Sequence, residues 1–98
     1  MVEQIEYTLA AYELAYRPYQ VIVEHYSDEP DIYYARHPEL VGCISHGSTP
    51  DEAETNLSDA RLLYIQCMLA DGLPVPEPDT RIRRIIMQVC YVKEGEYL

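Results

Sequence analysis

The spacing of apolar residues divides the chain into six predicted elements. Over residues 2–16 apolar side chains recur every three or four positions, as on one face of an α-helix, and Pro18 ends that helix. Residues 19–26 and 32–36 are rich in β-branched and aromatic residues, which predicts two strands joined by turn residues at 27–31. The face of the first helix would carry Val2, Ile5, Leu9, Tyr12 and Tyr16.

The second half of the pattern predicts a corner, a strand and a long helix. Residues 37–42 contain Pro and Gly and form the corner, and residues 43–46 form a short third strand. Thr49 can cap a helix, with Pro50 at its first position and Glu52 three residues after the cap. The apolar stripe of this helix would contain Ala53, Leu57, Ala60, Tyr64, Cys67 and Met68.

The end of the chain predicts a linker followed by a strand. Gly72 and the prolines of residues 73–78 end the long helix and favour an extended segment. Residues 81–93 alternate in the manner of a strand. The resulting order, α-β-β-β-α-β, predicts a single α+β domain over residues 1–98, with a small antiparallel-type sheet packed on one long helix.

Composition and charge limit the kinds of partner that the protein is expected to bind. The 98 residues include 17 acidic and 7 basic side chains, which gives a formal net charge of −10, and ten Tyr but no Phe or Trp. An acidic surface repels phosphate backbones, so we expect no direct nucleic-acid binding. A basic protein partner fits this charge, although the charge could also serve only solubility. The many tyrosines predict a half-exposed surface of the kind found at interfaces.

The cysteines and the apolar runs indicate the compartment. Cys43, Cys67 and Cys90 are odd in number, form no Cys-x-x-Cys pair and lie in apolar runs, as expected of unpaired cysteines in a reducing cytoplasm. The first residues lack the basic and then apolar pattern of a signal peptide. No apolar run approaches the ~20 residues that span a bilayer. A cytoplasmic protein without membrane association is therefore expected.

The residues that could form a catalytic or metal site have simpler structural explanations. Cys43 and His46, with His37 nearby, could suggest zinc, but a second ligand pair is missing and the first two would point to opposite faces of a strand. Cys43, His46 and Asp51 could be nominated as a nucleophilic triad, as chance triples often can. We therefore predict no catalytic residue, no metal ligand and no cofactor, with a core cysteine and a surface histidine instead.

Three further kinds of functional site are less well supported by the sequence than structural roles for the same residues. Nuclease chemistry with two divalent ions needs several carboxylates on strands and a helix, whereas the first two strands offer only Glu24. The glycines lack the spacing of a phosphate loop and suit turns and caps. Three tyrosines could stack on nucleic-acid bases, but no basic groove accompanies them. These tyrosines are Tyr33, Tyr34 and Tyr64.

Corner, cap and helix residues follow one another in a distinctive order: Pro38, Gly42, Cys43, Gly47, Thr49, Glu52, Ala53, Asn56, Leu57, Gly72, Pro76, Glu77 and Pro78. This ordered set resembles the pattern of the HicB antitoxin family. The resemblance covers residues 19–78, and residues 1–16 would be an additional N-terminal helix. Each matching residue is also explained as a turn, cap or core residue, so the order of the set carries the resemblance.

The resemblance implies a fold, a partner and an assembly. The family has a partial ribonuclease-H-like sheet with one long helix, usually dimerises or forms larger oligomers, and neutralises a small basic toxin, HicA, which cleaves mRNA. Longer members add a C-terminal DNA-binding domain, whereas the residues after Pro78 predict a strand here. The chain therefore resembles a short, single-domain member, expected to form a homodimer or a higher homo-oligomer.

The leading functional prediction is a non-catalytic antitoxin that binds and blocks a small basic toxin. The acidic hairpin and the strand after it are the predicted contact region, through Asp28, Glu29, Asp31 and Tyr34. The alternative is a stand-alone oligomeric module that binds another protein or a small ligand and has no toxin partner. A residual nuclease that uses Glu24 is a third hypothesis.

Overall fold

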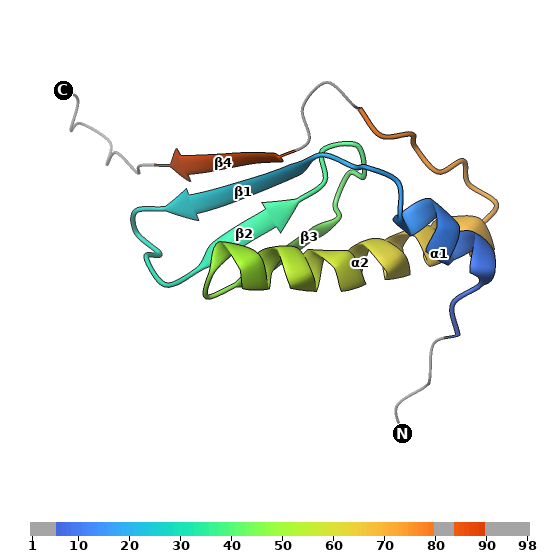
Figure 1. The fold of residues 1–98 in the computed structure, drawn as a ribbon, viewed down its shortest axis with the longest axis horizontal. Coiled ribbons are helices and arrows are strands. Elements are labelled where there is room, and N and C mark those ends of the chain that lie inside the picture. The colour runs from blue at the N-terminus through green and yellow to red at the C-terminus, as the bar shows by residue number, and fades with distance from the viewer. Residues whose placement is uncertain (1–5, 80–83, 90–98) are drawn as a thin grey trace.

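The computed structural model describes residues 6–79 and 84–89. Its elements follow the order helix, three strands, helix and strand, which confirms the α+β order that the hydrophobic pattern predicts. Figure 1 shows the strands side by side with the long helix running across them. The elements are α1 (Leu9–Ala15), β1 (Val21–Tyr26), β2 (Tyr33–Arg36), β3 (Ile44–Gly47), α2 (Pro50–Ala70) and β4 (Arg84–Val89).

The four strands form one sheet in the order β3-β2-β1-β4. β1 pairs antiparallel with β2, and β2 pairs antiparallel with β3, which confirms the predicted antiparallel pairing for these three strands. β4 runs parallel to β1, with Val21 opposite Arg84. A parallel neighbour requires a crossover connection, which includes α2 here. The strand predicted over residues 81–93 is described at Arg84–Val89, and its other positions lie outside the described residues.

The start of α2 confirms the predicted cap. The Thr49 side chain accepts a hydrogen bond of 3.1 Å from the backbone N–H of Glu52, and Pro50 occupies the first helical position. The Glu52 carboxylate reaches back to Ser48, whose backbone N–H and hydroxyl each donate to it at 3.1 Å. A standard capping box would use the N–H of Thr49 instead. Two donors just before the helix are thus satisfied, and the chain turns sharply from β3 into α2.

A glycine allows this sharp turn. A methyl group added at Gly47 would lie 2.6 Å from the backbone nitrogen of Ala53 and 2.8 Å from the carbonyl carbon of Glu52. The first turn of α2 therefore packs directly on the backbone at the end of β3.

At its C-terminal end, α2 stops at a glycine. Gly72 has a φ of +69°, and the N–H of Leu73 donates to the carbonyl of Met68 at 2.9 Å. The predicted helix stop is confirmed.

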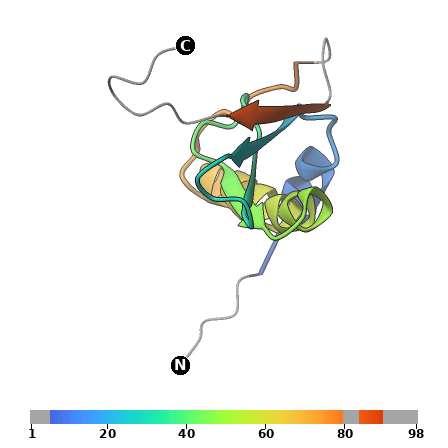
Figure 2. The same cartoon turned by 90° about the vertical axis from the view of Figure 1, so that its left-hand side faces the viewer.

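The core lies between one face of the sheet and the two helices, which lie next to each other in both views (Figures 1 and 2). Val23 and Ala35 are paired across β1 and β2, and both are fully buried. From α2, the predicted stripe is confirmed at Ala53 and Leu57 but is wrong at Cys67, which is exposed. Ile65 takes the buried position instead, because the buried residues of this helix follow steps of four.

The predicted first helix is wrong in its start and in its buried face. Residues 6–8 are not helical, and the helix begins at Leu9 because the Thr8 side chain caps it by accepting from the N–H of Ala11 at 3.2 Å. Leu9 and Tyr16, expected to face the core, are 73% and 87% exposed. Ala11 and Ala15 are buried instead, since small side chains let α1 approach α2 closely. Val2 and Ile5 lie outside the described residues.

Candidate functional site

The predicted contact residues lie on the β1–β2 hairpin and the strand that follows it. The hairpin loop is held by two backbone hydrogen bonds, from the N–H of Glu29 to the carbonyl of Tyr26 and from the N–H of Ile32 to the carbonyl of Glu29. Asp28 and Asp31 are exposed at the tip. Glu29 is only half-exposed, because its side chain turns back toward the sheet.

Glu29 and Tyr34 form a direct contact. The Tyr34 hydroxyl donates to the Glu29 carboxylate at 2.5 Å. The hydrogen bond to this negative charge raises the pKa of Tyr34, and the neighbouring charge of Asp28 acts in the same direction. The phenol therefore stays a hydrogen-bond donor, and a carboxylate accepting one donor retains capacity for others. The structure thus joins two of the four predicted contact residues in one small cluster.

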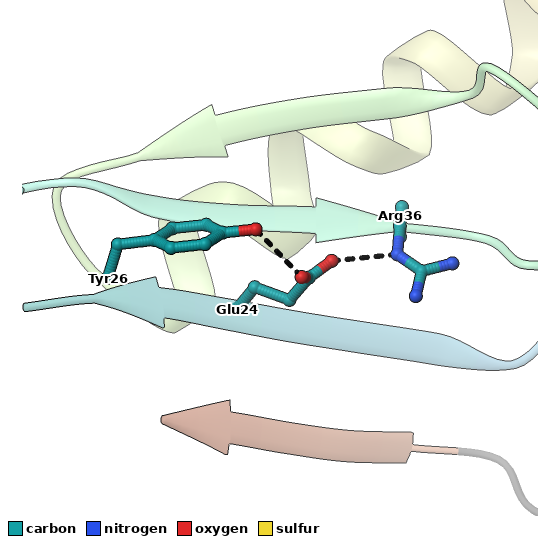
Figure 3. A network of polar contacts seen from close by, with 3 residues as sticks. All are labelled: Glu24, Tyr26 and Arg36. Carbon is teal, nitrogen blue, oxygen red and sulfur yellow. Dashed lines mark hydrogen bonds and ion pairs between the residues drawn. The ribbon is translucent and has the colours of Figure 1, made fainter. Parts of the chain in front are cut away.

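The cluster continues along the sheet through an ion pair. Arg36 on β2 donates from Nε to Glu24 on β1 at 2.7 Å, and the Tyr26 hydroxyl donates to the other carboxylate oxygen at 2.9 Å (Figure 3). The hydrogen bond from Arg36 lowers the pKa of Glu24, assisted by Tyr26 and opposed by partial burial. Glu24 is therefore ionised at neutral pH, and its side chain is fixed on the sheet.

Side chains alternate between the two faces of a strand, so this cluster and the core occupy opposite faces of the sheet. Val23 and Ala35 point toward α2, whereas Glu24, Tyr34 and Arg36 point away from it. We call this second side the open face. A depression of about 240 Å³ lies on it, which we call the open-face pocket, and its lining residues are Glu24, Tyr26, Glu29, Tyr34, Arg36 and Ile44.

The open-face pocket brings together some predicted residues and adds others. Glu29 and Tyr34 line it, while Asp28 and Asp31 lie on the exposed hairpin and do not. Sequence reasoning missed Tyr26 and Arg36 as site residues and considered Glu24 only for nuclease chemistry. The alternation on β1 carried the missing signal, because residues two apart share one face of a strand.

The candidates for nucleophilic or metal chemistry have other roles. Burial raises the pKa of the Cys43 thiol to about 11, which disfavours the thiolate, while His46 is exposed. His37 is 1% exposed and holds the corner in place through a contact of 2.7 Å with the carbonyl of Gln20. Among the described residues, no three His, Cys, Asp or Glu side chains are grouped so as to hold a metal ion.

His37 belongs to a buried polar hub that the sequence did not reveal. Arg61 of α2 lies 3.0 Å from its Nε2, and Glu39 of the corner accepts from the backbone N–H groups of Gln20 and Asp79, both at 2.9 Å. These contacts connect α2, the corner and the segment after α2. The hub therefore stabilises the fold behind the open face.

Among the helices described, none has the length and apolar character to cross a membrane.

Fold and surface together define a small α+β domain in which the described helices cover one face of the sheet, and the other face carries the pocket lined by Glu24, Glu29 and Tyr34. The family model described as "HicB_like antitoxin of bacterial toxin-antitoxin system" matches residues 19–94. The chain therefore belongs to the HicB-like antitoxin family. This confirms the resemblance found in the corner and helix-start residues.

A curated relative agrees with this assignment. The chain is 39% identical over 57 residues to the UPF0150 protein ssr1765 of Synechocystis sp., and the match covers 58% of this chain and 72% of that protein. No solved structure matches the chain significantly.

Proposed function

We propose that this protein is a non-catalytic antitoxin that binds and neutralises a small basic toxin of the HicA type, which cleaves mRNA. Membership of the HicB-like antitoxin family is the observation that carries this proposal. A toxin-antitoxin role follows from the family, and the identity of the toxin is the proposed step. The toxin would be met in the cytoplasm, where mRNA is translated.

The charge of the chain supports this kind of partner. A net charge of −10 steers a basic protein toward the antitoxin and competes with RNA for the same basic surface. Glu29 and Tyr34 line the open-face pocket, and Asp28 and Asp31 are exposed on the adjoining hairpin. They supply negative charge and hydrogen-bonding groups at and beside the open face of the sheet. We assign the toxin contact to this side, and the open face and the hairpin would cover the active surface of the toxin.

The chemistry of the described side chains supports binding over catalysis. Glu24 is engaged by Arg36 and Tyr26, which leaves it poorly suited to hold a divalent ion. Cys43 is a buried thiol with a raised pKa, and His37 is enclosed in the polar hub. Inhibition by occlusion needs only a complementary surface and no reactive group.

Growth rescue tests the proposal. A short basic protein encoded beside this chain would be expressed from an inducible promoter, with or without this chain on a second plasmid. We expect growth arrest and loss of mRNA with the basic protein alone, and recovery of both when this chain is co-expressed. Arrest that persists despite abundant folded antitoxin would contradict the proposal.

The exposed surface of α1 favours one alternative function. Leu9 and Tyr16 are largely exposed, and a groove of about 310 Å³ runs between α1 and α2 beside Tyr12 and Arg61. Such a surface suits a stand-alone oligomeric module that binds another protein or a small ligand. Oligomer size and partner binding of a Leu9→Ser, Tyr16→Ser variant distinguish the two functions, since the antitoxin interface would lie on the other side of the sheet.

A further inference from the structure

The walls of the open-face pocket combine aromatic rings with carboxylates. The rings of Tyr26 and Tyr34 meet edge to face, with 5.8 Å between their centroids. Glu24 and Glu29 are each hydrogen-bonded to one of these two hydroxyl groups. Both rings are therefore held in place by the carboxylates, so the pocket is shaped before any ligand arrives.

We propose that the open-face pocket binds an arginine side chain presented by the protein partner. Aromatic faces attract cations, and a guanidinium also stacks on rings and donates several hydrogen bonds in one plane. Glu29 accepts one bond from Tyr34, and two carboxylate oxygens offer about four acceptor positions in total. The pocket volume of about 240 Å³ accommodates the end of one such side chain.

The charges around the pocket select a monovalent cation. Among the lining residues that the structure describes, two carboxylates, Glu24 and Glu29, face one guanidinium, Arg36, which leaves one net negative charge. The charge of Asp28 also acts on Tyr34. An anion would meet unfavourable charge. A bare divalent metal ion would face the positive charge of Arg36, which already occupies Glu24 at 2.7 Å. An incoming guanidinium can instead lie against one of the two rings while it donates hydrogen bonds to Glu29.

The assignment of this arginine to a toxin rests on the proposed function, whereas the chemistry of the pocket can be tested without a toxin. The probe is the blocked peptide acetyl-Gly-Arg-Gly-amide, titrated into the full chain labelled with ¹⁵N and followed by NMR. Its control is the same peptide with citrulline in place of arginine, which keeps the shape and removes the charge. We expect saturable shifts at the pocket residues with arginine, and at least fivefold weaker binding with citrulline.

Matched variants place the binding at the pocket. Glu29→Gln removes one charge but can still accept the hydrogen bond from Tyr34, and we expect at least threefold weaker arginine binding. Asp59→Asn removes the same charge from the exposed side of α2, and we expect wild-type binding. Equal shifts with both peptides, absence of saturation, or equal weakening by the two variants would overturn the proposal.

The same variants separate this inference from the proposed function. If the arginine peptide binds at the pocket but no toxin is neutralised, the pocket assignment holds and the antitoxin function is wrong. The opposite outcome combines failure of the arginine peptide to bind with equal neutralisation of a toxin by the wild-type chain and by Glu29→Gln. In that case the antitoxin function holds and the pocket assignment is wrong.

Discussion

Arg61 donates a hydrogen bond of 3.0 Å from its guanidinium to Nε2 of His37. Arginine has no acceptor, so Nε2 must be the unprotonated nitrogen and Nδ1 must carry the hydrogen that is donated to the carbonyl of Gln20 at 2.7 Å. Both ring nitrogens are thus used by a neutral imidazole. The contact joins α2 to the corner between β2 and β3, and it requires His37 to stay uncharged.

This requirement predicts that stability declines in mild acid. Burial lowers the pKa of His37 below its ordinary value of 6.5, and Arg61 adds to this effect. As pH falls below about 6.5, the unfolded chain takes up a proton at His37 before the folded chain does, so the free energy of unfolding decreases. The slope from this one group is at most about 1.4 kcal/mol per pH unit. Urea unfolding at pH 7.5 and 5.5 measures it.

Histidine variants isolate this effect from other titrating groups. His37→Gln is expected to be less stable at pH 7.5 and to lose part of the pH dependence between 7.5 and 5.5. His46→Gln, at an exposed position, should keep the wild-type dependence. Direct NMR titration of the His37 ring gives a second measurement, and an apparent pKa at or above 6.5 would contradict the neutral contact.

The cap of α2 has a measurable contribution to stability. Thr49→Ala removes the side-chain acceptor for the N–H of Glu52 and is expected to lower the free energy of unfolding by about 1 kcal/mol. Thermal unfolding should show a decrease of roughly 4–8 °C. Thr55→Ala is the matched control, because Thr55 is exposed and its hydroxyl donates to the carbonyl of Asp51 inside the helix, where it caps nothing. Equal effects of the two substitutions would argue against the capping role.

The close approach at Gly47 predicts a steric effect. Gly47→Ala would place its methyl group 2.6 Å from the backbone nitrogen of Ala53, so β3 and α2 would have to separate. We expect a loss of about 1–3 kcal/mol in chemical denaturation. Gly42→Ala meets open space and is penalised only for its φ of +87°, so it should be the milder change. Wild-type stability of Gly47→Ala would show that the helix does not pack on this backbone.

The hairpin charges predict how association depends on salt. Reversal of Asp28, Glu29 and Asp31 to Lys should weaken binding of the basic partner at least tenfold at low ionic strength, mainly through a slower association rate. The loss should shrink as salt is added, because exposed charges are screened. Surface plasmon resonance at several salt concentrations measures both. The control variant reverses Glu13, Asp59 and Asp71 to Lys, which makes the same change in net charge away from the hairpin. It should retain most of the affinity.

Much of the fold could be predicted because local signals and tertiary contacts agree. Thr49, Pro50 and Glu52 mark the start of α2 in sequence, and the structure places the helix start there. The β1–β2 hairpin likewise follows from two β-rich runs joined by turn residues. In both places the chemistry that defines the element involves residues only a few positions apart.

The errors concern choices that depend on distant residues. For α1 the larger side chains Leu9 and Tyr16 suggested the buried face, but α2 selects the alanine face because close helix packing favours small residues. Thr8 is fixed by Gln66 of α2, which accepts from its N–H at 2.9 Å. The open-face pocket likewise depends on the register of β1 against β2, which sequence spacing leaves open.

Affinity purification of the tagged chain from its native host, with mass spectrometry of the proteins that accompany it, tests the antitoxin function most directly. An antitoxin should bring down a stoichiometric, small and basic companion whose toxicity this chain relieves. Recovery of this companion should fall when Asp28, Glu29 and Asp31 are reversed in charge. Recovery of the chain alone, as a homo-oligomer without such a companion, would contradict the antitoxin function and favour the stand-alone module.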